Sequence, residues 1–192
     1  MTLRALSLSI NPMVELSLHI LDIVKNSTKA GASLVTVEIN ESIARNRLEI
    51  IITDNGCGMD EEFLKNVTDP FKTTRTTRKV GMGLSLFKSA ALLTGGDFDI
   101  KSKKGEGTVV KAVFVHDSID RQPLGDMAST MVTLVSGNEN TDFVYRHNFE
   151  DKIFEFSTQE VKNIIGDISI ASPEIIAWIT GYIREGLQEI YK

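Results

Sequence analysis

The stretch ELSLHILDIVKNSTKA, residues 15–30, constrains the fold more than any other part of the chain. Its polar residues recur every three or four positions, so at about 100° per residue they share one side of a helix. This polar stripe consists of Glu15, His19, Asp22, Asn26 and Lys29. The opposite side is apolar and must pack against another layer. The pattern fits either a helix with a solvated polar face or one whose polar face has a function.

Two strands are predicted directly after this helix. SLVTVEIN alternates apolar with polar residues, and RLEIIITD places Leu48, Ile50 and Ile52 on one side. Period two puts Asp54 on that same apolar side. A short helix at MDEEFLKNV, a long loop at TDPFKTTRTTRKVGMG, a helix at GLSLFKSAALLTGG and strands at DFDIKSK and GTVVKAVFV follow. The predicted order is helix, two strands, helix, loop, helix, two strands.

Beyond residue 117 the pattern changes to a connector, HDSIDRQPLGD, and a second set of elements. Strands are predicted at STMVTLVS, FVYRHNF and KIFEFS, and a capping box starting at Ser157 predicts a helix start there. A last helix opens at Ser172, and its apolar stripe, with Trp178, is expected to pack on these strands, the alternative being a dimer or partner surface. The expected organisation is an N-terminal extension (1–12), a main domain (13–116) and a C-terminal α+β appendage (117–192).

Composition excludes several classes of function. The chain has 192 residues, a net charge of -5, 42% hydrophobic and 24% charged residues, so it lacks the basic excess that nucleic-acid binding needs. No apolar run reaches the roughly 20 residues that span a bilayer, so we expect no membrane insertion and a cytoplasmic location. The single cysteine and the absence of Cys/His clusters with metal-ligand spacing argue against a structural zinc.

Three glycine-containing motifs are candidates for binding a ligand. In DNGCGM (54–59), an Asp on a buried strand face is costly unless it is hydrogen-bonded, although Asp-Asn-Gly is also a good turn. GMGL (81–84) places glycines at a helix start, where free amides favour anions such as phosphate. GEGT (105–108) is by itself a good hairpin turn. Each motif alone is a weak signal.

Taken together, the order and spacing of these motifs resemble the Bergerat-fold (GHKL) ATPase superfamily, which includes gyrase, the large heat-shock chaperone, histidine kinases and MutL. DIVKNSTKAGA is similar to the N box of that superfamily, and DNGCGM, GMGL and GEGT are similar to its three glycine boxes. The resemblance covers residues 13–116. It implies an α+β fold, a two-layer α/β sandwich with helices on one face of a mixed, mostly antiparallel sheet.

The resemblance also implies ATP and Mg²⁺ as cofactors and assigns roles to residues. Asn26 would coordinate the magnesium ion, Lys29 would contact phosphate, and Asp54 would accept a hydrogen bond from the adenine amino group, with Thr108 helping through a water. The second glycine box ends in Leu84. Close backbone approach to the nucleotide would be allowed by Gly56, Gly58, Gly81 and Gly83. A lid at 69–83 would present a positive inner surface that includes Lys72.

Asp22 departs from the pattern, because members of the superfamily that hydrolyse ATP usually have Glu there as the base. The shorter Asp predicts slow hydrolysis, since misplacement by about 1 Å can cost on the order of 100-fold in rate. The leading hypothesis is a slow Mg-dependent ATPase that acts as a nucleotide switch, with a protein partner or homodimer contacted through the lid and the appendage. The alternatives are a protein serine/threonine kinase of the anti-sigma-factor type and a nucleotide-binding module without turnover.

Overall fold

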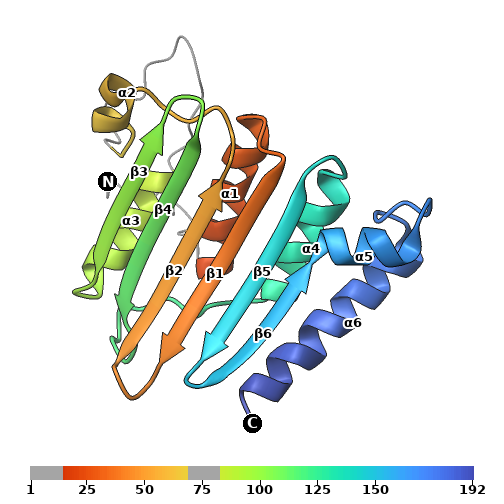
Figure 1. Ribbon diagram of the computed structural model, residues 1–192. Helices are drawn as coiled ribbons and strands as arrows, with labels where there is room; N and C mark the ends of the chain where they lie inside the picture. Colours follow the sequence, from red (N-terminus) through yellow and green to blue (C-terminus); the bar gives the residue numbers. More distant parts are fainter. Residues whose placement is uncertain (1–14, 69–82) are drawn as a thin grey trace, which may run out of the picture.

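The computed structural model describes residues 15–68 and 83–192. Its centre is a six-stranded sheet in the order β3-β4-β2-β1-β5-β6 (Figure 1). Neighbouring strands are antiparallel except for β1 and β5, which are parallel. The strands are β1 (Leu34–Ser42), β2 (Arg47–Asp54), β3 (Asp97–Lys103), β4 (Gly107–Val115), β5 (Asp142–Phe149) and β6 (Lys152–Ser157).

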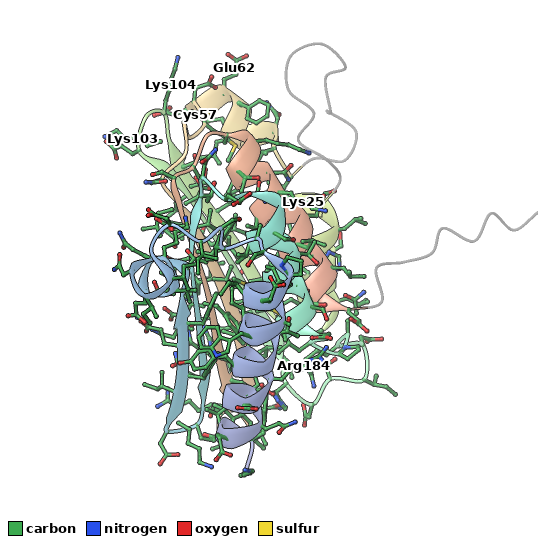
Figure 2. The ribbon with its side chains drawn as sticks, turned by 90° about the vertical axis from the view of Figure 1, so that its right-hand side faces the viewer. Lys25, Cys57, Glu62, Lys103, Lys104 and Arg184 are labelled. Atoms are coloured by element: carbon green, nitrogen blue, oxygen red, sulfur yellow. The ribbon has the colours of Figure 1, made fainter. Side chains whose placement is uncertain are left out.

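The long helices cover one face of this sheet, which confirms the predicted two-layer α+β sandwich (Figures 1 and 2). The helices are α1 (Leu16–Lys29), α2 (Glu61–Asn66), α3 (Gly83–Leu93), α4 (Met127–Gly137), α5 (Thr158–Ile165) and α6 (Pro173–Ile190). The other face is polar, with cross-strand ion pairs such as Lys111 Nζ to Glu49 Oε1 at 2.6 Å. None of the described helices is long and apolar enough to cross a membrane.

The alternating pattern of the strands builds the core. Val35, Val37 and Ile39 of β1 are fully buried on the helix side, and β2 places Leu48, Ile50 and Ile52 there as predicted. Leu16, Ile20, Ile23 and Val24 of α1 pack onto them and are also buried. The predicted element order from α1 to β4 is confirmed.

Residues 117–192 add strands to the same sheet. β5 pairs with β1 from Leu34↔Asp142 to Glu41↔Phe149, and its Phe143 and Tyr145 join the buried core. Two sequence predictions for this region differ from the structure.

The strand predicted at STMVTLVS is wrong, because residues 127–137 form α4. Valine and threonine favoured a strand locally. The carboxylate of Asp126 caps the helix by accepting from Ser129 N at 2.9 Å. Helical spacing then buries one stripe, and α4 packs against α1 and α6. The stripe is Met127, Met131, Leu134 and Val135.

The helix predicted to start at Ser157 begins there, but its capping box does not form. Ser157 makes no side-chain cap. Instead, the Thr158 hydroxyl accepts from Phe143 N at 2.8 Å and thereby ties α5 to β5. Tertiary hydrogen bonding therefore replaces the local cap.

The connector after β4 is attached to the start of α1. Leu16 N donates to Pro123 O at 3.0 Å and Ser17 N donates to Leu124 O at 2.8 Å. The first amides of a helix have no partners within it, so the connector satisfies two of them. The position of α1 thus depends on the segment that follows β4.

Candidate functional site

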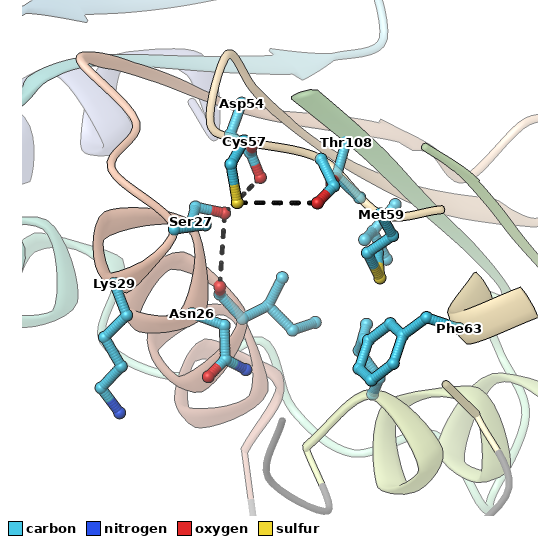
Figure 3. Close-up of a pocket in the computed structure, with 13 residues that line it drawn as sticks. Asn26, Ser27, Lys29, Asp54, Cys57, Met59, Phe63 and Thr108 are labelled. Atoms are coloured by element: carbon cyan, nitrogen blue, oxygen red, sulfur yellow. Dashed lines mark hydrogen bonds between the residues drawn. The ribbon is translucent and has the colours of Figure 1, made fainter. Parts of the chain in front are cut away.

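A cavity of about 380 Å³ lies between α1, the loop after β2, the short helix α2, the start of α3 and β4 (Figure 3). Most of its wall is apolar, and a few polar side chains enter it from α1 and from the strands. A concave apolar space with a few converging polar groups is the usual form of a small-molecule site. The cavity is lined by Ile23, Asn26, Ser27, Lys29, Ala30, Asp54, Cys57, Gly58, Met59, Phe63, Leu84, Thr108 and Val110.

Asp54 ends β2 with its side chain on the buried face, as period two predicts. Its Oδ2 accepts from the Ser27 hydroxyl at 2.6 Å, and its Oδ1 accepts from Gly56 N at 2.9 Å. These bonds offset the cost of burying the carboxylate and fix its direction. An ionised carboxylate has about four acceptor positions, so it retains capacity for a ligand.

The loop after Asp54 is held against the chain on both sides. Cys57 N donates to Ala30 O of α1 at 3.0 Å, and Gly105 N donates to Cys57 O at 2.8 Å. Gly58 has φ +61°, and a Cβ there would lie 2.0 Å from Lys103 O. Glycine is required at this position because the β3–β4 hairpin approaches so closely. The close backbone approach that Gly58 allows is therefore that of the β3–β4 hairpin of the same chain.

The polar stripe of α1 divides into two parts. Asn26 and Lys29 line the cavity, whereas His19 is only 2% exposed. The His19 ring stacks on Phe87 at a centroid distance of 5.6 Å, and its Nε2 contacts Gln122 Oε1 at 3.1 Å. Burial lowers the pKa of His19, although Gln122 and Asp22 oppose that shift. His19 is thus a buried packing residue between α1, α3 and the connector.

Asp22 lies between these two parts, against the first residue of α3. A Cβ at Gly83 would be 1.8 Å from Asp22 Oδ2, so the carboxylate touches the backbone there. Only glycine leaves room for this arrangement. Asp22 is half-buried and is not among the residues that line the cavity.

Comparison with known proteins identifies the family. The model of the family described as histidine kinase-, DNA gyrase B-, and HSP90-like ATPase matches residues 14–118, more than half of the chain. The chain belongs to this family. The predicted membership of the GHKL ATPase superfamily is confirmed, and the sheet and its helical layer are the Bergerat ATPase fold.

The curated relatives of this GHKL chain include sensor histidine kinases. The tetrathionate sensor histidine kinase of Salmonella typhimurium is 31% identical over 123 residues, which cover 62% of this chain and 20% of that protein. The histidine protein kinase DivJ of Caulobacter vibrioides is 32% identical over 99 residues, which cover 47% of this chain and 16% of that protein. The chain therefore spans a fifth or less of the length of these two relatives.

Solved structures with a similar fold include the Aquifex aeolicus MutL ATPase domain complexed with ADP. The similarity has a TM-score of 0.48 at 16% identity and covers 80% of this chain and 69% of that one.

Six of the residues that the sequence assigned to the site line the cavity, namely Asn26, Lys29, Asp54, Gly58, Leu84 and Thr108. Three others, Gly56, Asp22 and Gly83, are neighbours of lining residues. Gly56 packs against Ala30 and Asp54, and Gly83, which precedes Leu84, contacts Asp22. Lys72 and Gly81, most of the predicted lid and the N-terminal extension lie outside the described residues.

The residues of this site fit the magnesium nucleotide that the family implies. Asn26 Nδ2 is buried and finds no hydrogen-bond partner among residues 15–68 and 83–192. Rotation of an amide exchanges its nitrogen and oxygen, so Asn26 is free to present either atom to a ligand. Magnesium is typically held by one or two protein oxygens, with waters and phosphates completing the shell. No cluster of three acidic, His or Cys side chains for a metal exists in the described part of the chain.

The sequence did not predict that Ser27, Met59 and Phe63 line the cavity. A signal for Ser27 existed, because it continues the buried series Leu16, Ile20 and Ile23 at helical spacing. A hydroxyl on an apolar helix face needs a partner, and that partner is Asp54. Met59 and Phe63 carry no such signal, because their place depends on how the loop and α2 fold over the sheet.

Proposed function

We propose that this chain binds ATP with Mg²⁺ in the cavity between α1 and the sheet. The observation that carries the proposal is the placement of the polar groups, with Asp54 and Thr108 on one side of the cavity and Asn26 and Lys29 on another (Figure 3). Asp54 would accept a hydrogen bond from the adenine amino group, with Thr108 helping through a water, and the apolar wall would pack on the base. Asn26 would hold the magnesium ion and Lys29 would contact phosphate.

The start of α3 supports this orientation of the nucleotide. Leu84 at the start of α3 lines the cavity, and the N-terminus of a helix favours anions. Lys29 adds a positive charge at the end of α1. The lid residue Lys72 is proposed to add another charge, on the basis of the sequence alone.

Asp22 is proposed as the base that activates water for slow hydrolysis. Its carboxylate sits at the junction of α1 and α3, one helical turn from Asn26, so both side chains project from the same side of α1. The chain then acts as a nucleotide switch toward a protein partner or a second copy, through the lid and residues 117–192. We further propose a cytoplasmic location and no role for nucleic acid.

Transfer of phosphate to a protein is the second candidate function. It is favoured by the relatives, which are named histidine kinases. A protein serine/threonine kinase of the anti-sigma-factor type is the form that the sequence analysis favours, and a nucleotide-binding module without turnover is the third possibility.

The fate of a labelled γ-phosphate separates these functions. Incubation with γ-labelled ATP and Mg²⁺ releases labelled inorganic phosphate if the chain is an ATPase, labels a protein if it is a kinase, and leaves ATP intact if it only binds. We expect slow release of inorganic phosphate that Asp22→Asn abolishes while ATP affinity stays within a few-fold, because general-base catalysis contributes roughly 10²–10⁴ in rate. Equal release by wild type and Asp22→Asn would remove Asp22 from the reaction.

A further inference from the structure

The outer side of α6 carries two stacked aromatic rings. Ile179 and Ile183 of this helix are buried as predicted, whereas Trp178 and Tyr182 remain 51% and 43% exposed. Their rings stack with centroids 5.3 Å apart and an interplanar angle of 13°. α6 lies at the margin of the molecule in Figure 1 and is nearest the viewer in Figure 2. The two rings therefore form an open aromatic surface.

The aromatic stack is anchored in the core beneath it. The Tyr182 ring packs against Phe154 and Phe156 of β6, at centroid distances of 5.5 and 6.5 Å. Both phenylalanines are buried, at 7% and 2% exposure. A side chain that is already held in place in the free protein loses little conformational freedom on binding. Trp178, stacked on this anchored ring, is thus a preorganised contact surface.

The helix positions around the stack carry negative charge. At about 100° per residue, Glu174, Glu185 and Glu189 all fall within about 40° of Trp178 on the helix circumference. Glu189 forms an ion pair with Lys192. Glu174 and Glu185 form no ion pair with any residue in 15–68 or 83–192. Two carboxylates beside the aromatic surface are therefore not neutralised by the described part of the chain.

The single basic residue within α6 lies on another side of the helix. Arg184 is about 120° from Trp178 around the helix, and its Nη2 is 3.4 Å from Oδ2 of Asp126, the cap of α4. A second copy of the same surface would bring carboxylates against carboxylates, which disfavours self-pairing. A cationic side chain suits both features of the surface, because ring faces and carboxylates each attract it.

We propose that the outer side of α6 is the docking surface for a protein segment that carries arginine beside apolar residues. The planar guanidinium stacks on the exposed indole of Trp178 and donates to Glu174, one helical turn away. Apolar side chains of the segment cover Tyr182. The inference rests on the proposed function, since it names the chemistry of the protein partner contacted through residues 117–192, but the contact does not require ATP.

The test uses the fluorescence of Trp178, the only tryptophan of the chain. The probe is a synthetic helical peptide of arginine, leucine and alanine, titrated into the full chain without nucleotide. The matched control peptide has citrulline, the neutral analogue of arginine, at every arginine position. We expect a saturable fluorescence change with the arginine peptide, an affinity at least about tenfold higher than for the citrulline peptide, and weaker binding as NaCl is raised.

Variants locate the contact, with calorimetry and the same arginine peptide as the measurement. Trp178→Ala should weaken binding about tenfold or more, as expected for a central aromatic anchor. Trp178→Phe keeps a ring and should lose less, which gives a second result if the alanine variant fails to fold. Glu174→Gln should weaken binding about two- to fivefold, the size of an exposed ion pair. Glu62→Gln, an exposed position on α2 far from α6 in Figure 2, should bind as wild type does.

Several outcomes would overturn the inference. These are no fluorescence change at about 1 mM arginine peptide, equal affinity for the citrulline peptide, or unchanged affinity in the Trp178 variants and Glu174→Gln. A wild-type dimer in sedimentation analysis that Trp178→Ala dissociates would show instead that the surface binds a second copy. A separate titration with ATP distinguishes the two proposals. ATP binding without peptide binding overturns this inference alone, and peptide binding without ATP binding overturns the proposed nucleotide function alone.

Discussion

Gly83 and Asp22 touch at the first turn of α3, and this contact decides which side chain position 83 tolerates. The Asp22 carboxylate occupies the place where a Cβ would stand. Without that obstacle, alanine would suit a helical position better than glycine does, by about 0.4–1 kcal/mol. A side chain at position 83 would therefore require the Asp22 carboxylate, which comes from a residue more than sixty positions away in sequence, to move.

We predict that Gly83→Ala destabilises the wild-type chain but stabilises the Asp22→Ala variant. The added methyl group displaces the carboxylate in the first case and meets no carboxylate in the second. Urea unfolding of the two single variants and the double variant measures both free-energy changes. The same sign in both backgrounds would show that the contact does not govern position 83.

At the scale of elements, a series of side-chain hydrogen bonds near the end of β1 connects the C-terminal end of α6 to the sheet. Tyr191 donates to Glu41 Oε2 at 2.6 Å and lies 3.2 Å from His147 Nε2, and Tyr145 lies 2.8 Å from His147 Nδ1. The Tyr191 hydrogen goes to the carboxylate, so His147 Nε2–H donates to Tyr191 and Tyr145 donates to His147 Nδ1. His147 is fully buried, and every polar atom of its ring has a partner.

Tyr191→Phe should lower the free energy of unfolding by about 1–3 kcal/mol, because it leaves buried partners of the hydroxyl unsatisfied. The matched control is Tyr182→Phe, which removes a hydroxyl from a ring on α6 of similar exposure, 43% against 45% for Tyr191. Urea denaturation of both variants provides the measurement. Equal effects of the two substitutions would mean that the chain of hydrogen bonds does not stabilise α6.

The same network predicts an acid dependence of stability. Burial alone would raise the pKa of Glu41, but hydrogen bonds from His147, Tyr191 and His116 outweigh it and lower the pKa to about 2. The unfolded chain binds this proton below pH about 4.5 and the folded chain only near pH 2, so the stability from Glu41 is present above pH 4.5 and is lost as the pH falls toward 2.

Glu41→Gln should therefore reduce the slope of unfolding free energy against pH between 2 and 4.5, by up to about 1.4 kcal/mol per pH unit. Glu185→Gln, an exposed position on α6, should leave the slope unchanged. Urea midpoints measured across that pH range decide between these results, and an unaltered slope in Glu41→Gln would contradict the assigned pKa direction.

At the scale of the whole molecule, the sheet and the core run without interruption from β3 to β6. β5 pairs with β1 along its length, and α4 packs against α1, so residues on both sides of position 117 bury each other. We predict a single cooperative unfolding transition. The fluorescence of Trp178 on α6, the only tryptophan, should follow the same urea curve as the far-ultraviolet circular dichroism. Two separated curves would show that residues 117–192 unfold on their own.

Most of the first half of the fold could be predicted from the sequence, because its elements follow clear periods. The alternation in β1 and β2 placed Asp54 on the buried face, and the helical period placed Asn26 and Lys29 together. The N box and the glycine boxes then indicated the family. In these cases the signal is local or fixed by the spacing of motifs.

The remainder depends on contacts between distant parts of the chain. Val132 and Thr133 favour a strand locally, yet they lie in α4, because burial of the helical stripe outweighs that propensity. The parallel pairing of β5 with β1 joins segments about a hundred positions apart, which no local pattern specifies. The partnership of Ser102 with Thr108 likewise appears only when β3 and β4 are in register.

The central claim is that the Asp54 cavity binds ATP, and titration calorimetry with ATP on wild type and Asp54→Asn tests it most directly. An amide has one acceptor oxygen in place of two, so it cannot serve Ser27, Gly56 and a nucleotide amino group together. We predict Mg²⁺-dependent binding by wild type that Asp54→Asn weakens more than about tenfold, or 1.4 kcal/mol, while Asp99→Asn on the open sheet face binds normally. Normal ATP affinity in a folded Asp54→Asn chain, or no binding by wild type, would contradict the account.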